Sequence, residues 1–429
     1  EIRFAESGLI TRPPDPLMSL NNVVIVGAGQ AGYQTAASLR QEGFEGGITL
    51  IGDEPGVPYQ RPPLSKAYLL GKIGATALRF RTHEWFEQQR LERIEARVTR
   101  IDRETQRVEL ASGERVPYDH LVLATGARNR VPPIEGIELD GVFGIRTLEH
   151  ADALAPRVAA ARDVVVIGAG FIGLEFAAVA AAKGLSVHVV ELGTRPMARA
   201  LSTPMSSLFS AAHAGWGVKF DFGQTIARLV GDNGRVVAVE TGDGRRLPAQ
   251  LVVYGIGVLP NTELAADASL AVHNGICVDA QLLTSDPSIS AIGDTVSFPS
   301  AWSGAPIRLE SVQNAVDQAR TVAARLVGKP ATYTALPWFW SDQGDLKLQI
   351  AGLSDGHDET VLLGSGESRQ LSVLCFRSGR LIAVESCNRP GDHMASRKLL
   401  ARAALPTIAQ AAQPGFDLKE FEAATREPG

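Results

Sequence analysis

Two glycine loops are the parts of this sequence whose residue types and spacing could do chemistry. Both follow the G-x-G-x-x-G spacing, with Gly27, Gly29 and Gly32 in the first loop and Gly168, Gly170 and Gly173 in the second. In such a loop the first glycine allows a tight turn, the second lets the backbone approach a pyrophosphate, and the third lets a helix pack on a strand. The free N–H groups and the positive dipole end of the following helix then face the phosphates. The pattern therefore predicts two dinucleotide-binding sites on one chain.

A strand and a helix flank each loop and must position it. Apolar runs typical of buried strands precede the loops, and each following helix ends near a further glycine, Gly43 or Gly184. The residues before the third glycines, Ala31 and Ile172, are expected to line the sites. The flanking strands are expected at residues 23–26 and 48–51 in the first copy and at residues 164–167 and 187–190 in the second. Each copy is therefore predicted to be a βαβ unit.

Each second strand is expected to close on an acid, Asp53 in the first copy and Glu191 in the second. An acid about 20 residues beyond the glycines can accept hydrogen bonds from ribose hydroxyls. Glu191 also disfavours NADPH, because its carboxylate would repel a 2′-phosphate. We therefore expect NADH, although Arg195 and Arg199 nearby leave NADPH as an alternative. Our preferred interpretation is that these two arginines make pyrophosphate or surface contacts.

The composition is that of a multi-domain globular protein. The chain has 429 residues, 45% of them hydrophobic and 21% charged, and domains of about 100 to 200 residues would give two to four units. The formal net charge of -5 offers nucleic acid or an anionic membrane no attraction over the whole chain. Because neither an apolar stretch of about 18 residues nor a signal-peptide pattern is found, we expect a cytoplasmic protein without a membrane anchor.

The cysteines restrict the redox chemistry. The sequence has three, Cys277, Cys375 and Cys387, and no two of them have C-x-x-C spacing. A flavoenzyme that reduces disulfides needs a redox cysteine pair, and a protein-bound iron–sulfur cluster usually needs four thiolates. We therefore expect no metal site and interpret the three cysteines as core residues. Electrons that enter this chain would have to pass to a separate carrier.

The second βαβ unit is expected to be inserted into the first domain. Residues 121–126 and 289–294 both read as a short apolar strand that ends in a glycine turn, one before and one after that unit. Residues 329 to about 405 change to short alternating runs with aromatic residues, which is typical of antiparallel strands with helices. A third, α+β domain is therefore predicted. Residues 1–17 read as a leader that takes no part in the fold.

Five motifs resemble one known family. They are residues 59–66 (YQRPPLSK), 124–126 (ATG), 292–294 (IGD), 310–315 (ESVQNA) and 337–343 (PWFWSDQ). In order, and over residues 20 to 420, the chain is similar to the putidaredoxin-reductase-like FAD-dependent NADH:ferredoxin reductases of bacterial cytochrome P450 and aromatic-ring dioxygenase systems. The resemblance implies a glutathione-reductase-type α/β fold, with two Rossmann-like dinucleotide-binding domains and a C-terminal α+β domain. The implied boundaries are 18–132 with 256–328 for the FAD-binding domain, 133–255 for the inserted NAD-binding domain, and 329–429 for the C-terminal domain.

The resemblance also implies which residues hold the two cofactors. For FAD, bound without a covalent link, they are Gly27, Gly29, Ala31, Gly32, Asp53, Lys66, Val98, Thr125, Gly126, Arg146, Asp294 and Val312. For NAD they are Gly168, Gly170, Ile172, Gly173, Glu191 and Arg195. Core packing is an alternative role for Val98 and Val312. Lys66 and Glu175 are similar to a catalytic pair near the flavin N5, where a cation stabilises the anionic reduced flavin and a glutamate fixes the nicotinamide carboxamide.

The activity implied is hydride transfer from NADH to FAD N5, followed by single-electron transfer to a [2Fe–2S] ferredoxin that supplies a P450 or a Rieske-type oxygenase. Three alternatives stay open. An NADH dehydrogenase with a quinone or another acceptor shares both loops, but a membrane-bound one would be expected to carry a more apolar C-terminal anchor. An NADH oxidase or peroxidase would need a cysteine beside the flavin. A redox-sensing protein would bind NADH with little turnover.

Ferredoxins of such systems are acidic, so a basic docking patch is expected near the flavin. Its candidates are Arg308, Lys347, Arg397 and Lys398, with Trp338 and Trp340 either at the flavin end or in the core. The protein is expected to be a monomer or a weak dimer.

Overall fold

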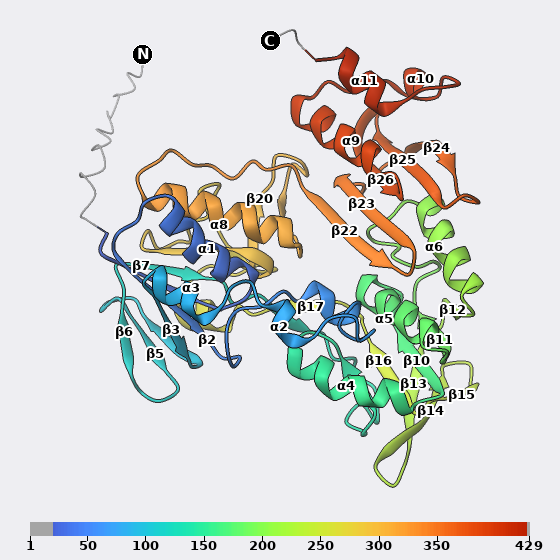
Figure 1. The fold of residues 1–429 in the computed structure, drawn as a ribbon, viewed down its shortest axis with the longest axis horizontal. Helices are drawn as coiled ribbons and strands as arrows, with labels where there is room; N and C mark the ends of the chain where they lie inside the picture. The colour runs from blue at the N-terminus through green and yellow to red at the C-terminus, as the bar shows by residue number, and fades with distance from the viewer. Residues whose placement is uncertain (1–19, 427–429) are drawn as a thin grey trace, which may run out of the picture.

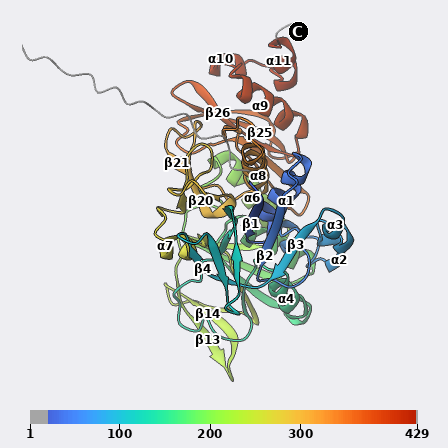
Figure 2. The same ribbon diagram turned by 90° about the vertical axis from the view of Figure 1, so that its left-hand side faces the viewer.

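The computed structural model describes residues 20–426 and divides them among three regions, each built on its own sheet (Figure 1). Both views place the C-terminal helices at one end of the molecule and the hairpin of β13 (Ile226–Asp232) and β14 (Arg235–Thr241) at the other (Figure 2). The leader expected at residues 1–17 lies outside the described residues.

The first region is a parallel sheet of five strands. In spatial order they are β19 (Ile289–Ala291), β7 (His120–Leu123), β1 (Asn22–Val26), β2 (Gly47–Gly52) and β3 (Leu91–Glu95). The inner strands are almost continuous apolar runs, because a parallel sheet is covered on both faces. Two helices, α1 (Gln30–Gln41) and α8 (Val312–Leu326), lie side by side against it (Figure 1).

A second parallel sheet lies between β7 and β19 in the sequence. Its strands, in spatial order, are β12 (Lys219–Phe222), β11 (Ser186–Glu191), β10 (Asp163–Ile167), β16 (Leu251–Tyr254) and β9 (Val142–Gly144). Its helices are α4 (Leu148–Ala160), α5 (Phe171–Ala182) and α6 (Thr203–Gly215). The chain leaves the first region through β8 (Ala127–Asn129) and returns through its antiparallel partner β17 (Val258–Pro260). The second unit is thus inserted, while the residue boundaries given above stay predictions.

The third region is an antiparallel sheet of five strands with helices packed against it. The strands are β22 (Trp338–Gln343), β23 (Leu346–Gly352), β26 (Arg380–Cys387), β25 (Gln370–Arg377) and β24 (Glu359–Ser365). The helices are α9 (Pro390–Arg402), α10 (Ile408–Ala411) and α11 (Leu418–Ala424). Alternating sequence runs in this part of the chain therefore form antiparallel strands, as predicted.

Smaller elements complete the fold. Two further antiparallel sheets combine β4 (Val98–Asp102), β5 (Arg107–Leu110) and β6 (Arg115–Pro117), and β13, β14 and β15 (Arg246–Pro248). A mixed sheet combines β18 (Ile276–Cys277), β20 (Val296–Pro299) and β21 (Pro306–Ile307). The short helices are η1 (Pro62–Ser65), α2 (Ala75–Leu78), α3 (His83–Gln88), α7 (Glu263–Asp267) and η2 (Gly293–Thr295).

One hydrophobic core is shared by the second and third regions. Met205 and Phe209 of α6 belong to the same buried cluster as Leu348 of β23 and Val373 of β25. Helix α5 is apolar on almost every side and contacts both β10 and β22, so it is covered by both regions. The C-terminal sheet therefore packs closely against the second region. It also contacts α5, the helix that follows the second glycine loop.

Candidate active site

The glycine loops leave no room for other residues at their first and third glycines. Gly27 and Gly168 have φ angles of +110° and +97°, which only glycine adopts readily. A Cβ added to Gly27 would lie 2.1 Å from the carbonyl oxygen of Ala124. A Cβ added to Gly32 would lie 1.8 Å from the carbonyl oxygen of Gly27, and one at the matching Gly173 would lie 2.2 Å from that of Gly168. These glycines are therefore required by the close approach of backbone to backbone.

The second glycine of each loop faces open space. A Cβ at Gly29 would meet no atom within 4 Å, and one at Gly170 would have its nearest neighbour, the Gly255 carbonyl oxygen, 3.5 Å away. Gly29 and Gly170 are the N-caps of α1 and α5, and neither helix has a side-chain hydrogen bond at this end. Their first-turn N–H groups are available to an anion, so both sites fit the pyrophosphate of a dinucleotide.

The acids that follow the two loops do not occupy matching positions. The N–H of Gly27 donates to the carbonyl oxygen of Ile51 at 2.8 Å, and that of Gly168 to Val190 at 2.9 Å. Glu191 is thus the next residue in the second copy, but Gly52 is the matching residue in the first. A Cβ at Gly52 would lie 2.5 Å from the Cβ of Ala28, so the first loop has no space for a side chain there. Asp53 follows one position later and is exposed; its contact with a ribose stays a prediction.

Glu191 is held rigidly at the second loop. Its Oε2 accepts a hydrogen bond of 2.6 Å from the N–H of Ala169, and its Oε1 accepts one of 2.6 Å from the N–H of Gly193. Arg195, which we expected to contact NAD, forms hydrogen bonds within the segment that leads into α6. Its guanidinium donates to the carbonyl oxygens of Leu201 and Ala198 and to Ser206 Oγ. These bonds fix the loop before α6, and the contact of Arg195 with NAD stays a prediction.

The two residues inside the helices, Ala31 and Ile172, differ in exposure. Ala31 is 7% exposed, whereas Ile172 is 42% exposed beside the second loop.

Val98 belongs to the hydrophobic core of the first region, which favours the packing alternative for this residue. Val312 is the first residue of α8, half-buried beside the N-cap Ser311.

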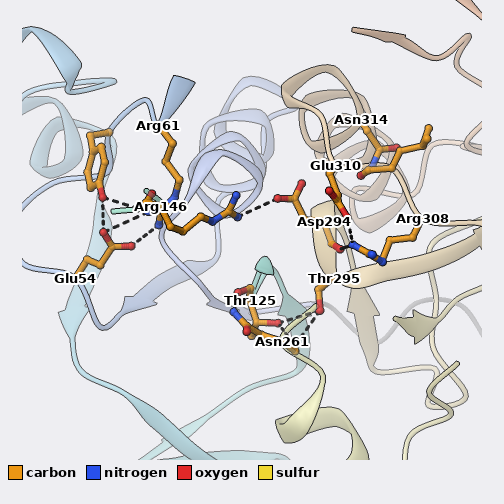
Figure 3. A network of polar contacts seen from close by, with 12 residues as sticks. Glu54, Arg61, Thr125, Arg146, Asn261, Asp294, Thr295, Arg308, Glu310 and Asn314 are labelled. Carbon is orange, nitrogen blue, oxygen red and sulfur yellow. Dashed lines mark hydrogen bonds and ion pairs between the residues drawn. The ribbon is translucent and has the colours of Figure 1, made fainter. Parts of the chain in front are cut away.

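An arginine and an aspartate from distant parts of the sequence meet beside the first loop. The Nη2 of Arg146 donates to Asp294 Oδ2 at 2.9 Å, and both side chains are mostly buried (Figure 3). The main-chain carbonyl oxygen of Arg146 in turn accepts a 2.9 Å hydrogen bond from Arg61 Nη1. The structure therefore brings together two residues that the resemblance assigned to FAD, and adds a third that the sequence reasoning quoted without a role.

Glu54 anchors this network from the end of β2. Its carboxylate pairs with Arg61 (Figure 3). It also accepts a hydrogen bond from the hydroxyl of Tyr59. Burial lowers the pKa of Arg61, but Glu54, Tyr59 and Asp294 together outweigh this effect, so the pKa is raised overall. Burial, with Glu54 nearby, raises the pKa of Tyr59 to about 12. The Tyr59 oxygen also accepts from the N–H of Leu148, the first residue of α4, so the network joins the first region to the second. Sequence reasoning missed Glu54, which stands beside the expected acid.

Asn261 joins the glycine turns that end β7 and β19. Its side-chain Nδ2 donates to the main-chain oxygen of Thr125 at 2.8 Å (Figure 3). Its main-chain oxygen accepts hydrogen bonds from the hydroxyls of Thr125 and Thr295 at 2.7 and 2.9 Å. Gly126 follows with a φ of +64°, and a Cβ there would be 3.5 Å from Arg146 Nη2. The hydrogen bonds of Asn261 therefore fix the Thr125–Gly126 turn next to the guanidinium group of Arg146.

The predicted catalytic pair lies where the three regions meet. Lys66 Nζ is 3.0 Å from Glu175 Oε1, and the two side chains are 16% and 4% exposed. The other carboxylate oxygen of Glu175 accepts a 2.6 Å hydrogen bond from Ser65, and Oε1 also accepts one of 2.6 Å from Ser341. Burial raises the pKa of Glu175, and Lys66 and the two serines oppose this rise. The structure thus places a lysine and a buried carboxylate in contact, while their catalytic roles stay predictions.

The expected docking residues differ in their exposure and surroundings, and their role in docking stays a prediction. The guanidinium carbon of Arg397 lies 4.5 Å from the ring centre of Trp338, whose ring is 5.4 Å from that of Trp340. Arg308 is only 12% exposed, because it pairs with Glu310 and donates to the main-chain oxygen of Asp294 (Figure 3). Lys347 is exposed but lies towards the other end of the β22–β23 pair, opposite Asp342.

The described residues 20–426 also bear on three expectations: no membrane anchor, no metal site and cysteines in the core. None of their helices has the length and apolar character needed to cross a membrane. Within the same range, no three histidine, cysteine, aspartate or glutamate side chains lie together as metal ligands would. Cys375 and Cys387 are buried thiols of the C-terminal sheet, and Cys277 is a half-buried thiol of β18.

Comparisons with known proteins agree with this arrangement. Residues 21–319 match the pyridine nucleotide-disulphide oxidoreductase family, and residues 338–422 match the reductase C-terminal family. Rhodocoxin reductase of Rhodococcus erythropolis is 51% identical over 93% of this chain and 93% of its own length. A ferredoxin reductase of a cytochrome P450 system from Rhodopseudomonas palustris superimposes with a TM-score of 0.91 at 51% identity, covering 93% of this chain and 99% of its own.

A third comparison concerns a reductase solved together with its partner. The covalent complex of putidaredoxin reductase with putidaredoxin gives a TM-score of 0.91 at 39% identity, covering 94% of this chain and 98% of the matched one. The fold is thus the glutathione-reductase type that the sequence predicts. This chain belongs to the pyridine nucleotide-disulphide oxidoreductase family, among the putidaredoxin-reductase-like ferredoxin reductases.

Proposed function

We propose that this chain is an FAD-dependent NADH:ferredoxin reductase that supplies a [2Fe–2S] ferredoxin of a cytochrome P450 or Rieske-type oxygenase system. The relatives named above support this activity. The observation that carries the proposal is the Lys66–Glu175 contact, which joins the loop after η1 in the first region to the helix of the second glycine loop. This contact supports the proposal, because a residue pair that lies between two dinucleotide sites can act on both cofactors at once.

FAD, when bound, supplies the ability to accept two electrons as a hydride and to release them singly. The chain supplies position and charge. The N-termini of α1 and α5 attract the two pyrophosphates, and Asp294 and Arg146 present a carboxylate and a cation beside the first loop. Lys66 places a positive charge where negative charge develops, and Glu175 accepts a hydrogen bond from the nicotinamide carboxamide.

We assign the first loop to FAD and the second to NADH. Glu191 supports this choice, because two backbone N–H groups fix its carboxylate at the end of β11. A fixed carboxylate can accept hydrogen bonds from ribose hydroxyls and would repel a 2′-phosphate. Three free thiols and the use of NADH also favour the cytoplasm as the location.

For the ferredoxin we propose a docking surface made of Trp338, Trp340, Arg397 and Lys398. Lys398 is exposed, Met394 on the same helix is 50% exposed, and Arg397 lies over the Trp338 ring. The N–H of Trp338 donates to Gln313 near the start of α8, so this surface adjoins the first region. A basic surface of this kind would attract an acidic partner and raise its rate of encounter.

The proposed function is tested by the reduction of cytochrome c with NADH, with and without an acidic [2Fe–2S] ferredoxin. We expect little direct reduction and a strong acceleration by the ferredoxin. Absence of acceleration would contradict the assignment, and rapid reduction of a soluble quinone would then favour an NADH dehydrogenase. Slow turnover with every acceptor, together with a persistent charge-transfer absorbance, would favour a redox sensor.

A further inference from the structure

The carboxylate of Glu175 is held by all three regions of the molecule. Ser65 from η1 donates to Oε2, and Ser341 from β22 donates to Oε1, each at 2.6 Å. Lys66 contacts the same Oε1 at 3.0 Å. Glu175 itself lies on α5, in the helix that opens at the second glycine loop. The C-terminal sheet thus contributes a direct contact to the predicted catalytic pair.

The hydroxyl of Ser341 is itself oriented by two further buried residues. Gln343 Nε2 donates to Ser341 Oγ at 3.2 Å, and Gln343 Oε1 lies 2.8 Å from Nε2 of His213 on α6. Ser341, Gln343 and His213 are all 0% exposed. Burial lowers the pKa of His213 to about 4, so at neutral pH its ring is uncharged and can donate from Nε2. His213 then donates to Gln343, Gln343 donates to Ser341, and Ser341 donates to Glu175, which is the final acceptor.

This order of donors fixes the one proton of the Ser341 hydroxyl. Because Gln343 donates to the serine oxygen, the serine can use its own proton only towards Glu175. Three groups contact the Glu175 carboxylate: Ser65 and Lys66, from η1 and the residue after it, and Ser341 from β22. Loss of the Ser341 hydroxyl would therefore leave Oε1 with Lys66 as its one partner among these groups.

We propose that Ser341 is a positioning residue for hydride transfer, and that it acts by orienting the carboxylate of Glu175 and keeping it charged. The proposal rests on the catalytic roles proposed above for Lys66 and Glu175. It gives the C-terminal region a part in the reaction with NADH, in addition to a part in docking the ferredoxin. His213 and Gln343 support Ser341 from α6 and β22.

The chain offers a matched control in Ser372 of β25. Its hydroxyl donates to Asp392 Oδ2 at 2.8 Å, and the residue is 0% exposed, so it too is a buried serine bonded to a carboxylate in the C-terminal region. Its acceptor lies on α9 and not in the catalytic pair. S372A therefore reproduces the loss of packing and of a buried hydrogen bond to a carboxylate without touching Glu175.

Two measurements on the FAD-loaded protein test the proposal. The first is the limiting rate of flavin reduction by NADH in a stopped-flow instrument, across pH. Since a hydrogen bond to a buried charge is lost, we expect S341A to slow this rate about tenfold, and S341T, which keeps the hydroxyl, to recover most of it. The second is an infrared titration of the oxidised protein, in which E175Q identifies the Glu175 carboxyl band. We expect that band to titrate at a higher pH in S341A than in the wild type, and S372A to change neither result.

Unchanged reduction and an unchanged carboxyl titration in S341A, beside a slow E175Q, would overturn the proposal. An E175Q that reduced as fast as the wild type would overturn it together with the role of the catalytic pair. If S341A does not fold, Q343M, which removes the amide that orients the serine, is expected to show the same changes to a smaller degree, and normal behaviour of Q343M would count against the proposal. Flavin reduction needs no ferredoxin, so an incorrect partner cannot imitate any of these results.

Discussion

Arg61 donates a hydrogen bond from Nη1 to the main-chain carbonyl oxygen of Arg146, and the guanidinium of Arg146 reaches Asp294. Arg61 is in turn paired with Glu54 at the end of β2. One ion pair in the first region therefore holds the backbone of the segment that enters α4, and with it a side chain that we assign to the FAD site.

Removal of the Glu54 charge should weaken FAD binding. E54Q keeps the shape of the side chain but loses the charge that holds Arg61, so we expect the Kd for FAD to rise by roughly tenfold, measured by titration of the apoprotein. The control is E45Q, because Glu45 and its partner Arg90 are 82% and 68% exposed and an exposed pair contributes little. Equal FAD affinity in the two variants would contradict the role of the network.

The second and third glycines of the first loop should behave differently when replaced by alanine. Gly29 has free space for a Cβ, so G29A should fold with a near-normal melting temperature but lose FAD, because the methyl group occupies the approach to the pyrophosphate. Gly32 has none, so G32A should fail to accumulate as folded protein. The readouts are the FAD content and the thermal unfolding curve of each. Full FAD content in G29A would show that the cofactor does not approach this backbone.

Replacement of Glu191 should relax the choice of nucleotide. We expect E191S to lower the ratio of kcat/KM for NADH to that for NADPH by about tenfold or more, because a fixed carboxylate no longer meets the 2′-position. Glu240 on β14, which pairs with Arg228 on the surface, provides the control variant E240S. An unchanged ratio in E191S would mean that Glu191 does not contact the ribose.

His120 should make the first region sensitive to acid. It is 4% exposed, and burial together with the charge of Arg325 lowers its pKa from 6.5 to about 3. Above pH 6.5 the ring is neutral in both the folded and the unfolded states, so its contribution is complete. As the pH falls towards 3 the unfolded state binds the proton first, and the free energy of unfolding should drop by about 1.4 kcal/mol per pH unit.

Urea unfolding from neutral pH to about pH 5 would measure this loss, and H120N, whose amide does not titrate, should flatten the dependence. The exposed His273 gives the matched variant H273N, for which the slope should equal that of the wild type. A wild-type slope in H120N would assign the acid sensitivity to other groups.

Charge reversal at the docking surface should separate ferredoxin binding from the reaction with NADH. R397E removes the cation over Trp338, so we expect the KM for ferredoxin to rise several-fold and its salt dependence to weaken. NADH-dependent reduction of ferricyanide should be unchanged. K347E is the matched reversal at the distant part of the β22–β23 pair, and it should leave the ferredoxin KM near the wild-type value. The reverse order of effects would place the ferredoxin at Lys347.

Much of the fold could be predicted because its signals are local. The glycine spacing, the apolar strands around each loop and the alternating runs after residue 329 each specify an element within a few residues. The insertion of the second unit followed from two similar strand-and-turn segments on either side of it. The assignment of cofactors and activity required the family resemblance, since two similar loops do not by themselves distinguish FAD from NADH.

The sequence could not supply the contacts that depend on the folded chain. Asp53 and Glu191 look equivalent along the chain, but the pairing of Gly27 with Ile51 shows that Gly52 is the true counterpart of Glu191. Arg308 was expected to contribute to docking, and this role stays a prediction, but its pairing with Glu310 leaves its side chain only 12% exposed. Ser341 could be recognised as part of a motif, but its contact with Glu175 spans 166 positions and depends on how two regions pack.

The core that α6 shares with β23 and β25 has a consequence for how such reductases could diversify. A C-terminal region that buries the same side chains as its neighbour cannot be exchanged between relatives as an independent module, because a foreign sheet would leave cavities or clashes around Met205 and Phe209. Adaptation to a new electron acceptor should instead arise from single substitutions on the outer faces of β22 and α9. Chimaeras of two relatives should therefore remain stable only when α6 is transferred together with the sheet.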